Sequence, residues 1–391
     1  MNGGSQSLRR GQPPTEYGST LNLLYRTNVR KSRQHLEICG DELMRQKLTE
    51  LCDILYGFAF DSAGFTEDST YPPLVRIRDV KRGYSETNYS GDYQEQYVIH
   101  AGDLLIGMDG EFNIARWKSR DALLNQRVCK ISAKEGTEEE YLRFALSRAL
   151  REIENRTAFV TVKHLSAKEL NKLELQVPSL SEQNRIAITL RRIEQLIDLR
   201  NEELKKLDEL IRARFVELFG DPISNSKNLE TKSLNEIMIL KAGDFTAASA
   251  ISDTLTETHR YPCYGGNGIR GFVAEYNQEG EYSLIGRQGA LSGNVQYAKG
   301  RFKNTEHALL VTPKIQMNSI WLNQLLINLE LKRFQTGAAQ PGLSVKNLQD
   351  IPIITVSIEK QNRFADFVAK IDKSKCDASN ITSATQYQLA S

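Results

Sequence analysis

The chain has 391 residues, of which 51 are Lys or Arg and 49 are Asp or Glu, so its formal net charge is only +2. Hydrophobic residues make up 40% and charged residues 26%, a mixture typical of globular proteins rather than disordered or fibrous ones. The sequence contains no run of about 18 apolar residues that could span a membrane, and the first ten residues lack the apolar core of a secretory signal. This length accommodates two domains of ordinary size.

The cysteines are scattered, odd in number and without a CxxC pair: Cys39, Cys52, Cys129, Cys263 and Cys376. This usage favours a reducing compartment and gives no support for a zinc site. We therefore expect a cytoplasmic protein with no metal or other cofactor of its own.

Residues 1–47 match no pattern that we recognise and form an N-terminal segment of unclear role. A helix near Asp41–Glu50 and a simple tail are both open readings. From residue 48 to 178, short strands between turn residues are followed by an amphipathic helix and an alternating strand ending at Val177. This pattern predicts a mixed α+β domain.

Residues 179–222 predict one long helix. Apolar residues recur at alternating spacings of four and three, which is the 3.5-residue repeat of a coiled-coil seam, and Gly220-Asp221-Pro222 ends the run. Ser179 and Glu182 have the capping-box spacing at its start. The predicted seam consists of Ile186, Leu190, Ile193, Ile197, Leu204, Leu207, Ile211 and Leu218.

Residues 223–355 repeat the first domain at a spacing of about 180 residues. Four landmarks recur in the same order: Leu105-Ile106-Gly107 with Leu284-Ile285-Gly286, Asn125 with Asn304, Ser166 with Ser344, and Gln183 with Gln361. A period this long indicates a duplicated domain, since solenoid repeats are about 20–50 residues long.

Residues 356–391 predict a second, distal helix, because Phe364, Val368 and Ile371 have the same phase as the start of the first helix. The two helices are expected to form an antiparallel coiled coil, with two core helices of one globular domain as the alternative. After Asp372 the segment becomes polar and loses the heptad. We therefore expect the distal helix to be short or frayed there.

Catalytic motifs are absent: the sequence has no GxxxxGK[ST], GxSxG or HExxH pattern. Residues 266–271 fit GxGxxG, but a dinucleotide loop needs a helix directly after it, and Phe272–Tyr276 predicts a strand. Local charge is more informative than net charge. Residues 282–349 hold eight Lys or Arg against two acids, and Val75–Arg82 holds four cations against one acid. A solvated loop face is the alternative explanation for each cluster.

The segment VPSLSEQNRIAITLRRIEQLIDLRNEELKKLDELIRARFVELFGDP resembles the central conserved region of the specificity (S) subunit of type I restriction–modification systems. Residues 261–273, 284–295 and 336–353 resemble segments of the target recognition domains of that family. The resemblance covers about residues 48 to 372.

The resemblance implies two target recognition domains, each reading one half of a split site in double-stranded DNA, separated by two long helices in an antiparallel coiled coil. It also implies docking of methyltransferase (M) subunits, two in number, on those helices, with restriction (R) subunits bound through M. S-adenosylmethionine, ATP and Mg would be used only by these partners, and the chain itself would not be an enzyme.

Phosphate contacts need Lys and Arg, whereas base reading needs Arg for guanine and Asn or Gln for adenine. On this basis the candidate DNA-binding residues are Arg76, Arg78, Lys81, Arg82, Arg116 and Lys118 in the first domain, and Asn267, Arg270, Arg287, Gln288, Asn294, Lys303 and Asn304 in the second. Trp117, Tyr84, Tyr89 and Tyr93 could stack on bases or pack, and packing is favoured for the tryptophan.

Two other functions remain open. A fusion of methyltransferase and specificity domains would need a methyl-donor motif, which the sequence lacks. A two-domain scaffold that joins protein partners without reading DNA needs only the repeat and the helix.

Overall fold

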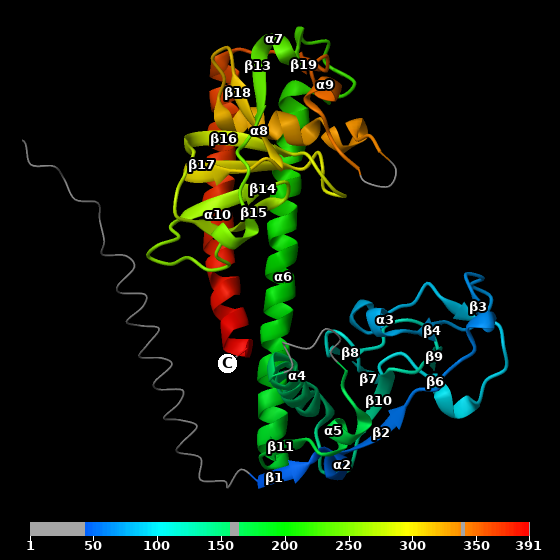
Figure 1. The fold of residues 1–391 in the computed structure, drawn as a ribbon. Coiled ribbons are helices and arrows are strands. Elements are labelled where there is room, and N and C mark those ends of the chain that lie inside the picture. The colour runs from blue at the N-terminus through cyan, green and yellow to red at the C-terminus, as the bar shows by residue number, and fades with distance from the viewer. Residues whose placement is uncertain (1–43, 157–163, 338–340, 391) are drawn as a thin grey trace, which may run out of the picture. The chain divides into compact units, whose positions relative to one another are not determined.

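The computed structural model describes residues 44–156, 164–337 and 341–390, with side chains up to Lys375 (Figure 1). The chain divides into two compact units, the first ending at Ile193 and the second beginning at Glu194. The long helix α6 (Leu180–Phe219) contributes residues to both units, and each unit is described by itself.

The first unit contains a four-stranded antiparallel sheet in the order β2-β10-β7-β8. Its strands are β2 (Cys52–Tyr56), β7 (Leu104–Gly107), β8 (Ile114–Arg116) and β10 (Val128–Ala133). A separate antiparallel pair joins β1 (Met44–Lys47) to β11 (Glu174–Val177). The remaining elements are α2 (Leu48–Leu51), η1 (Ser62–Gly64), β3 (Phe65–Thr66), β4 (Leu74–Val75), α3 (Ile77–Arg82), β5 (Asn88–Tyr89), η2 (Glu95–Tyr97), β6 (Val98–Ile99), β9 (Ala122–Leu124), α4 (Glu139–Arg156) and α5 (Ala167–Asn171).

Helix α4 covers the sheet of the first unit because its apolar residues recur every fourth position. Leu142, Leu146 and Leu150 are fully buried and pack in one cluster with Leu104 and Ile106 of β7. This spacing places all three leucines on one helix face. The amphipathic helix predicted after the strands is therefore confirmed.

The second unit contains a six-stranded sheet in the order β13-β18-β16-β17-β14-β15. Its strands are β13 (Met238–Ala242), β14 (Tyr261–Gly265), β15 (Gly268–Val273), β16 (Gln278–Gly286), β17 (Val295–Asn304) and β18 (Ala308–Pro313). Strands β14 and β17 are parallel, and the other neighbours are antiparallel. The remaining elements are β12 (Thr231–Ser233), α7 (Leu234–Ile237), η3 (Ala248–Ala250), α8 (Ser319–Asn328), η4 (Leu331–Phe334), α9 (Val345–Leu348), β19 (Pro352–Ile354) and α10 (Ile358–Ala390).

The internal repeat appears in the strand order of the two units. The strand order β2-β10-β7-β8 of the first sheet corresponds to β13-β18-β16-β17 in the second. The pair β1-β11 corresponds to the pair β12-β19. Gly57 and Gly243 follow equivalent strands. A Cβ atom at either would lie 2.1 Å from a carbonyl oxygen, that of Asn125 or Asn304 respectively, so only glycine fits at these crossings.

Within the second unit, α6 and α10 run antiparallel, as Figure 1 shows for the green and red helices. The Phe215 ring lies 5.4 Å from that of Phe364, and the Asp208 carboxylate lies 2.5 Å from the ammonium of Lys375. A lower residue number on α6 thus pairs with a higher one on α10, as expected for antiparallel helices. The predicted antiparallel pair is confirmed here. The end of the pair that contains Phe215 and Phe364 also belongs to the core of this unit, together with Trp321 of α8.

Two predictions about these helices need correction. Leu218 is 38% exposed, whereas Phe215 and Phe219 are buried in its place. The straight helix has 3.6 residues per turn, so the buried face drifts away from a strict heptad and follows Ile211, Phe215 and Phe219. Helix α10 continues to Ala390 and does not end near Asp372. The segment after Asp372 contains no Gly or Pro to stop it.

The other seam residues differ in burial. Ile211, Phe364 and Val368 are buried, and Ile371 is partly buried against the same core. The remaining six are partly buried: Ile186, Leu190, Ile193, Ile197, Leu204 and Leu207. A coiled-coil role for these six stays a prediction, because the side chains of α10 beyond Lys375 lie outside the described residues.

The end of the N-terminal segment belongs to the fold of the first unit. Residues 44–47 form β1, and Leu48–Leu51 form α2, whose Leu48 and Leu51 are buried. The helix considered near Asp41–Glu50 is thus only the single turn α2 after a strand. Residues 1–43 lie outside the described part of the chain.

Candidate nucleic-acid interface

Helix α3 gathers the basic residues of the first unit on an exposed surface. Arg78, Lys81 and Arg82 are exposed, while Arg76 precedes the helix and is partly buried. Asp79, which is 2% exposed, accepts from the backbone N–H of Arg76 at 3.0 Å and fixes the helix start. The one acid of the cluster therefore serves the helix cap, and the cations remain at the surface.

Lys118 joins this basic surface. Its backbone N–H donates to Gly83 at the end of α3, and its side-chain stem lies against that glycine, where φ is +77°. A side chain at Gly83 would collide with the stem of Lys118, so the glycine permits both the left-handed helix end and this contact. Lys118 is exposed beside the α3 cations.

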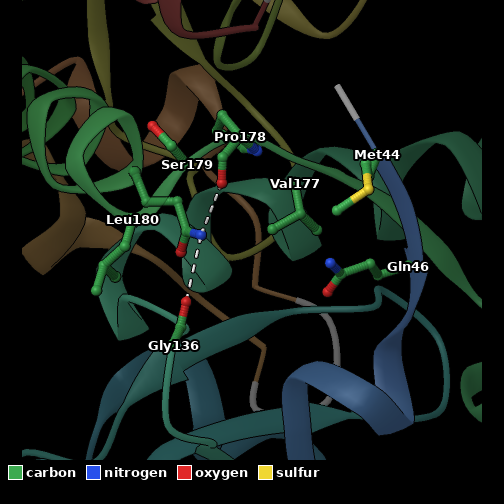
Figure 2. A pocket seen from close by; sticks show the side chains of 8 residues that line it. Met44, Gln46, Gly136, Val177, Pro178, Ser179 and Leu180 are labelled. Atoms are coloured by element: carbon green, nitrogen blue, oxygen red, sulfur yellow. Dashed lines mark hydrogen bonds between the residues drawn. The ribbon is translucent and has the colours of Figure 1, made fainter. Parts of the chain in front are cut away.

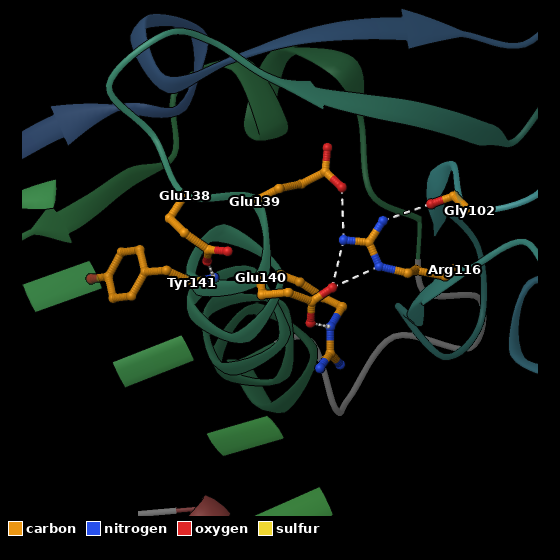
Figure 3. A network of polar contacts seen from close by, with 7 residues as sticks. Gly102, Arg116, Glu138, Glu139, Glu140 and Tyr141 are labelled. Atoms are coloured by element: carbon orange, nitrogen blue, oxygen red, sulfur yellow. Dashed lines mark hydrogen bonds and ion pairs between the residues drawn. The ribbon is translucent and has the colours of Figure 1, made fainter. Parts of the chain in front are cut away.

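Arg116 is not part of the basic surface. Its guanidinium donates to Glu140 at 2.6 Å and to the carbonyl oxygen of Gly102 at 2.6 Å, and it pairs with Glu139 at 2.7 Å (Figure 3). Arg143 donates to the other oxygen of Glu140 at 2.8 Å. Arg116 thus joins β8 to the start of α4, and all its described contacts serve the fold.

This network shifts the pKa of both partners. Burial alone would raise the pKa of Glu140, but the hydrogen bonds from Arg143 and Arg116 outweigh it and hold this pKa below its ordinary value. Burial would likewise lower the pKa of Arg116, and the two glutamates raise it instead. Both groups are therefore charged near neutral pH.

In the second unit, four candidates meet at the end of β16 where the chain leaves the sheet. Arg287 and Gln288 follow Gly286, the side-chain amide of Asn294 donates to Asn267 at 2.9 Å, and the turn at Gly266 lies against Gly286. A Cβ atom on Gly286 would lie 2.2 Å from the carbonyl oxygen of Gly266. The glycines thus allow two loops to approach each other closely. The strand expected at Phe272–Tyr276 instead begins within the GxGxxG sequence, since β15 runs from Gly268 to Val273, and no helix follows the motif directly.

The other three candidates have different environments. Arg270 is exposed on β15. Lys303 is 20% exposed and lies 3.3 Å from the carboxylate of Asp244. Asn304 is 1% exposed, and its side chain donates weakly to the carbonyl oxygen of Ala308 at 3.4 Å. Asn304 therefore cannot read a base in this structure. Its repeat in the first unit, Asn125, is also buried.

Sequence reasoning missed several polar residues at the same end of each sheet. In the first unit these are Asp109, Arg127 and His164, and in the second Glu306 and His307. Arg127 is the one Lys or Arg among the five, so counting basic residues could not find this group. The repeat itself could have done so, since all five lie next to its landmarks, Gly107, Asn125, Ser166 and Asn304.

The aromatic residues divide between core and surface. Trp117 is 1% exposed and donates to the carbonyl oxygen of Arg120 at 2.7 Å, so its predicted packing role is confirmed. Tyr89 is buried against Phe60 with ring centroids 4.8 Å apart. Tyr84 and Tyr93 are 48% and 45% exposed. Only these last two could stack on a base without rearrangement.

The repeated glutamine marks the junction between each unit's helix and its closing long helix. Gln183, 1% exposed, accepts from the backbone N–H of Glu138 at 2.9 Å and donates to Pro178 at 3.0 Å. Gln361, 3% exposed, accepts from Asn318 at 2.8 Å and donates to Val356 at 2.9 Å. A hollow of about 320 Å³ adjoins the first junction, between Met44, Pro178 and Leu180 (Figure 2).

Helix α6 also carries exposed apolar residues within the second unit. Leu196, Leu199 and Leu210 are 56%, 61% and 46% exposed. Single exposed apolar residues are common on protein surfaces, whereas several on one helix face are the kind of feature that a contact surface uses.

Within the described ranges, no helix is long and apolar enough to cross a membrane, and no group of three or more His, Cys, Asp or Glu side chains could hold a metal ion. The described cysteines Cys52, Cys129 and Cys263 are buried and unpaired.

A comparison with protein-family models matches residues 41–209 and again 226–384 to the type I restriction modification DNA specificity domain. The chain belongs to this family. Two matches to one domain model agree with the duplication seen in the strand order of the two units.

Relatives in this family include two specificity subunits from Escherichia coli. The type I restriction enzyme EcoprrI specificity subunit is 45% identical over 141 residues, which are 36% of this chain and 35% of that subunit. The EcoBI specificity subunit is 36% identical over 234 residues, 58% of this chain and 49% of that one. The matched part thus spans half or less of the length of these relatives.

A crystal structure of a type I restriction–modification S subunit from M. genitalium has a similar fold. Its TM-score is 0.53 at 18% sequence identity, and the match covers 90% of this chain and 95% of that one. The α+β architecture with two target recognition domains predicted from the sequence is that of this family.

Proposed function

We propose that the chain is the sequence-specific DNA-recognition subunit of a type I restriction–modification complex and that each unit reads one half of a bipartite target. The target recognition domains would comprise residues 48–178, with β1 added, and 223–355. The observation that carries the proposal is a fold built twice, with polar side chains at the same end of each sheet, the partly buried Asp109 and the exposed Gln288. The DNA and its partner subunits would be met in the cytoplasm.

The basic surface at α3 is suited to phosphate. Arg78, Lys81, Arg82 and Lys118 are exposed together. Lys81 and Arg82 pair with Glu111 and Glu86, which are more than half exposed, at 3.5 Å and 3.9 Å, and Arg78 lies 3.7 Å from the helix-capping Asp79. Such loose surface pairs contribute little and exchange readily for phosphate. These cations would supply sequence-independent affinity, and side chains at loop tips would supply specificity.

Methyl transfer and cleavage would belong to partner subunits. Two M subunits would dock on the long helices, and R subunits would bind through M, using S-adenosylmethionine, ATP and Mg. The exposed leucines Leu196, Leu199 and Leu210 of α6 support a docking surface for M on this helix. They equally suit a pure scaffold, so DNA binding distinguishes the two functions.

The test is DNA binding by the purified chain together with its M subunit. We expect selective binding to one bipartite sequence, with affinity that falls steeply as salt increases because phosphate contacts release counterions. The chain alone should transfer no methyl group from S-adenosylmethionine. Equal, weak binding to all sequences would favour the scaffold, and methyl transfer by the chain alone would contradict the proposed division of labour.

The docking surface has its own test. Replacing Leu199 and Leu210 by Ser should weaken assembly with M at least about tenfold, since central apolar contacts dominate such interfaces. Thermal unfolding of the chain alone should change little, because both side chains are about half exposed. Replacing the exposed Glu202 by Ser is the matched control, and unchanged assembly of the leucine variant would place M elsewhere.

A further inference from the structure

The end of the central sheet carries the same backbone arrangement in both units. An isolated antiparallel bridge joins Asp109 to His164 in the first unit and Gln288 to Gly342 in the second. Beside it, Leu165 donates to the carbonyl oxygen of Met108 at 2.7 Å. In the second unit, the backbone N–H of Leu343 donates to the carbonyl oxygen of Arg287 at 2.8 Å. Two segments far apart in the sequence are therefore fixed side by side in the same way twice.

A third segment completes this arrangement. The backbone N–H of Met108 donates to Arg127 at 2.8 Å, and that of Arg287 donates to His307 at 2.9 Å. Arg127 has φ of +70°, a left-handed conformation that is uncommon for residues other than glycine and is often found at functional positions. The backbone thus holds three loop segments against one another at each sheet end.

In the first unit, the side chains on this frame form a polar cluster. The Nδ1 atom of His164 lies 2.5 Å from Oδ1 of Asp109, and Nη1 of Arg127 lies 3.0 Å from the same ring. The Nε atom of Arg127 lies 3.6 Å from the other oxygen of Asp109. The side chains of Arg127 and His164 are 50% and 44% exposed. They are held in place and still accessible to a ligand.

In the second unit, equivalent positions carry a different polar cluster. The Nδ1 atom of His307 lies 2.8 Å from Oε1 of Gln288, and its Nε2 atom lies 3.1 Å from Glu306. Arg287 donates through Nη1 to the carbonyl oxygen of Glu306 at 3.2 Å. Its Nε atom and Oε2 of Glu306 are buried without a hydrogen-bond partner among the described residues.

The two units share this backbone frame, meaning the isolated bridge and the hydrogen bonds beside it, whereas the side chains on it differ. The residues of the frame are the same in both units: Leu-Ile-Gly before the loop, the buried asparagine, and Leu-Ser after the bridge. Between these residues, Asp109 is replaced by Gln288, Arg127 by His307, and His164 by Gly342. Reading two different half-sites requires this combination, because each base edge has its own pattern of hydrogen-bond donors, acceptors and, for thymine, a methyl group.

We propose that Asp109, Arg127 and His164 determine the sequence read by the first unit, and that Arg287, Gln288 and His307 do so in the second. This inference rests on the proposed function and adds its specificity-determining residues. The basic surface adjoins the first cluster: Lys81 of α3 pairs at 3.5 Å with Glu111, which lies on the same loop as Asp109. A DNA backbone on α3 would thus bring base edges toward this loop.

The experiment exchanges the two side chains of the isolated bridge between the units. The first variant combines Asp109→Gln and His164→Gly, and the reverse variant combines Gln288→Asp and Gly342→His. A Cβ atom at Gly342 would meet the carbonyl oxygen of Arg287 at 3.6 Å, an ordinary contact, so the reverse variant should fold. Each full chain is produced with its M subunit, and the methylated sequence is read across a genome.

We expect each variant to lose preference for the original base at one or more positions of a single half-site, by roughly 10- to 100-fold. The other half-site should be methylated as before, which also shows that the variant has folded and assembled. Arg82→Gln, which removes a cation of α3, is the control. It should lower methylation evenly and leave the sequence unchanged.

The outcomes separate this inference from the proposed function. If both transplants methylate the original bipartite sequence with unchanged preference, the clusters do not determine specificity, although the proposed function stands. If the unaltered chain directs M to no bipartite sequence, both fail. If one variant fails to fold or assemble, the other decides by the same criterion for its own half-site.

Discussion

Arg116 and Lys118 lie two residues apart and have opposite roles. Arg116 points into a network with Glu139 and Glu140, while Lys118 is exposed beside α3. Composition alone treats both as basic surface residues. What separates them is the helix α4, which supplies the acids from more than twenty positions downstream in the sequence.

The Arg116 network predicts a specific acid sensitivity. Because the pKa of Glu140 is lowered from 4.5 in the folded protein, its carboxylate stabilises the fold above that pH, and the contribution is lost as the pH falls through the lowered value. Arg116→Met should cost about 1–3 kcal/mol at pH 7 and should flatten the loss of stability below about pH 4.5. Chemical denaturation at pH 7 and pH 3.5 measures both effects.

The control for this prediction lies on the same helix. Arg148 is 68% exposed and pairs with Glu152 one turn away, so Arg148→Met should unfold close to the unaltered protein at either pH. If both variants show the same small effect, the Arg116 network contributes nothing particular to the fold.

Exposed cations of α3 make a different prediction. Replacing Arg78 and Arg82 by Gln should weaken DNA binding uniformly across sequences and reduce the slope of log affinity against log salt by about 0.9 for each lost phosphate contact. Titrations of the complex with M at several salt concentrations measure the slope. An unchanged slope would mean that the DNA backbone does not contact α3.

At the scale of elements, the closing helices combine two roles. Ile211, Phe215 and Phe219 of α6 and Phe364 of α10 belong to the core of the second unit, whereas Leu199 on α6 is exposed. A heptad pattern in the sequence indicates the helix and its partner. It does not show where the pair leaves a globular core, because the same leucine spacing serves both situations.

The aromatic group where α6 meets α10 should dominate the stability of this pair. Phe364 is fully buried, with its ring 5.4 Å and 5.7 Å from those of Phe215 and Phe219. Phe364→Ala should cost about 3–5 kcal/mol. The denaturant-induced unfolding transition of the second unit measures this loss of stability. Val216→Ala, at an exposed position of α6, is the control. A loss below about 1 kcal/mol would mean that the helices pair elsewhere.

At the scale of the whole molecule, the internal repeat was the sequence feature that predicted most of the architecture. Its landmarks placed Leu105 and Leu284 on equivalent strands, and both units have the same strand order around them. The landmarks also predicted the second long helix from Gln361. The base-reading candidates were less predictable. Asn304 is a residue type suited to reading adenine, but its side chain is buried. Whether a polar loop residue faces solvent depends on which distant loop packs against it, and a single sequence does not contain that information.

The central claim is that two duplicated units each read one half of a bipartite target. Replacing residues 223–355 by the corresponding domain of another family member, and sequencing the methylated sites in cells that also contain M, tests it most directly. We expect one half-site to change while the half-site read by residues 48–178 stays the same. A hybrid that is active and changes both half-sites, or neither, would contradict the account.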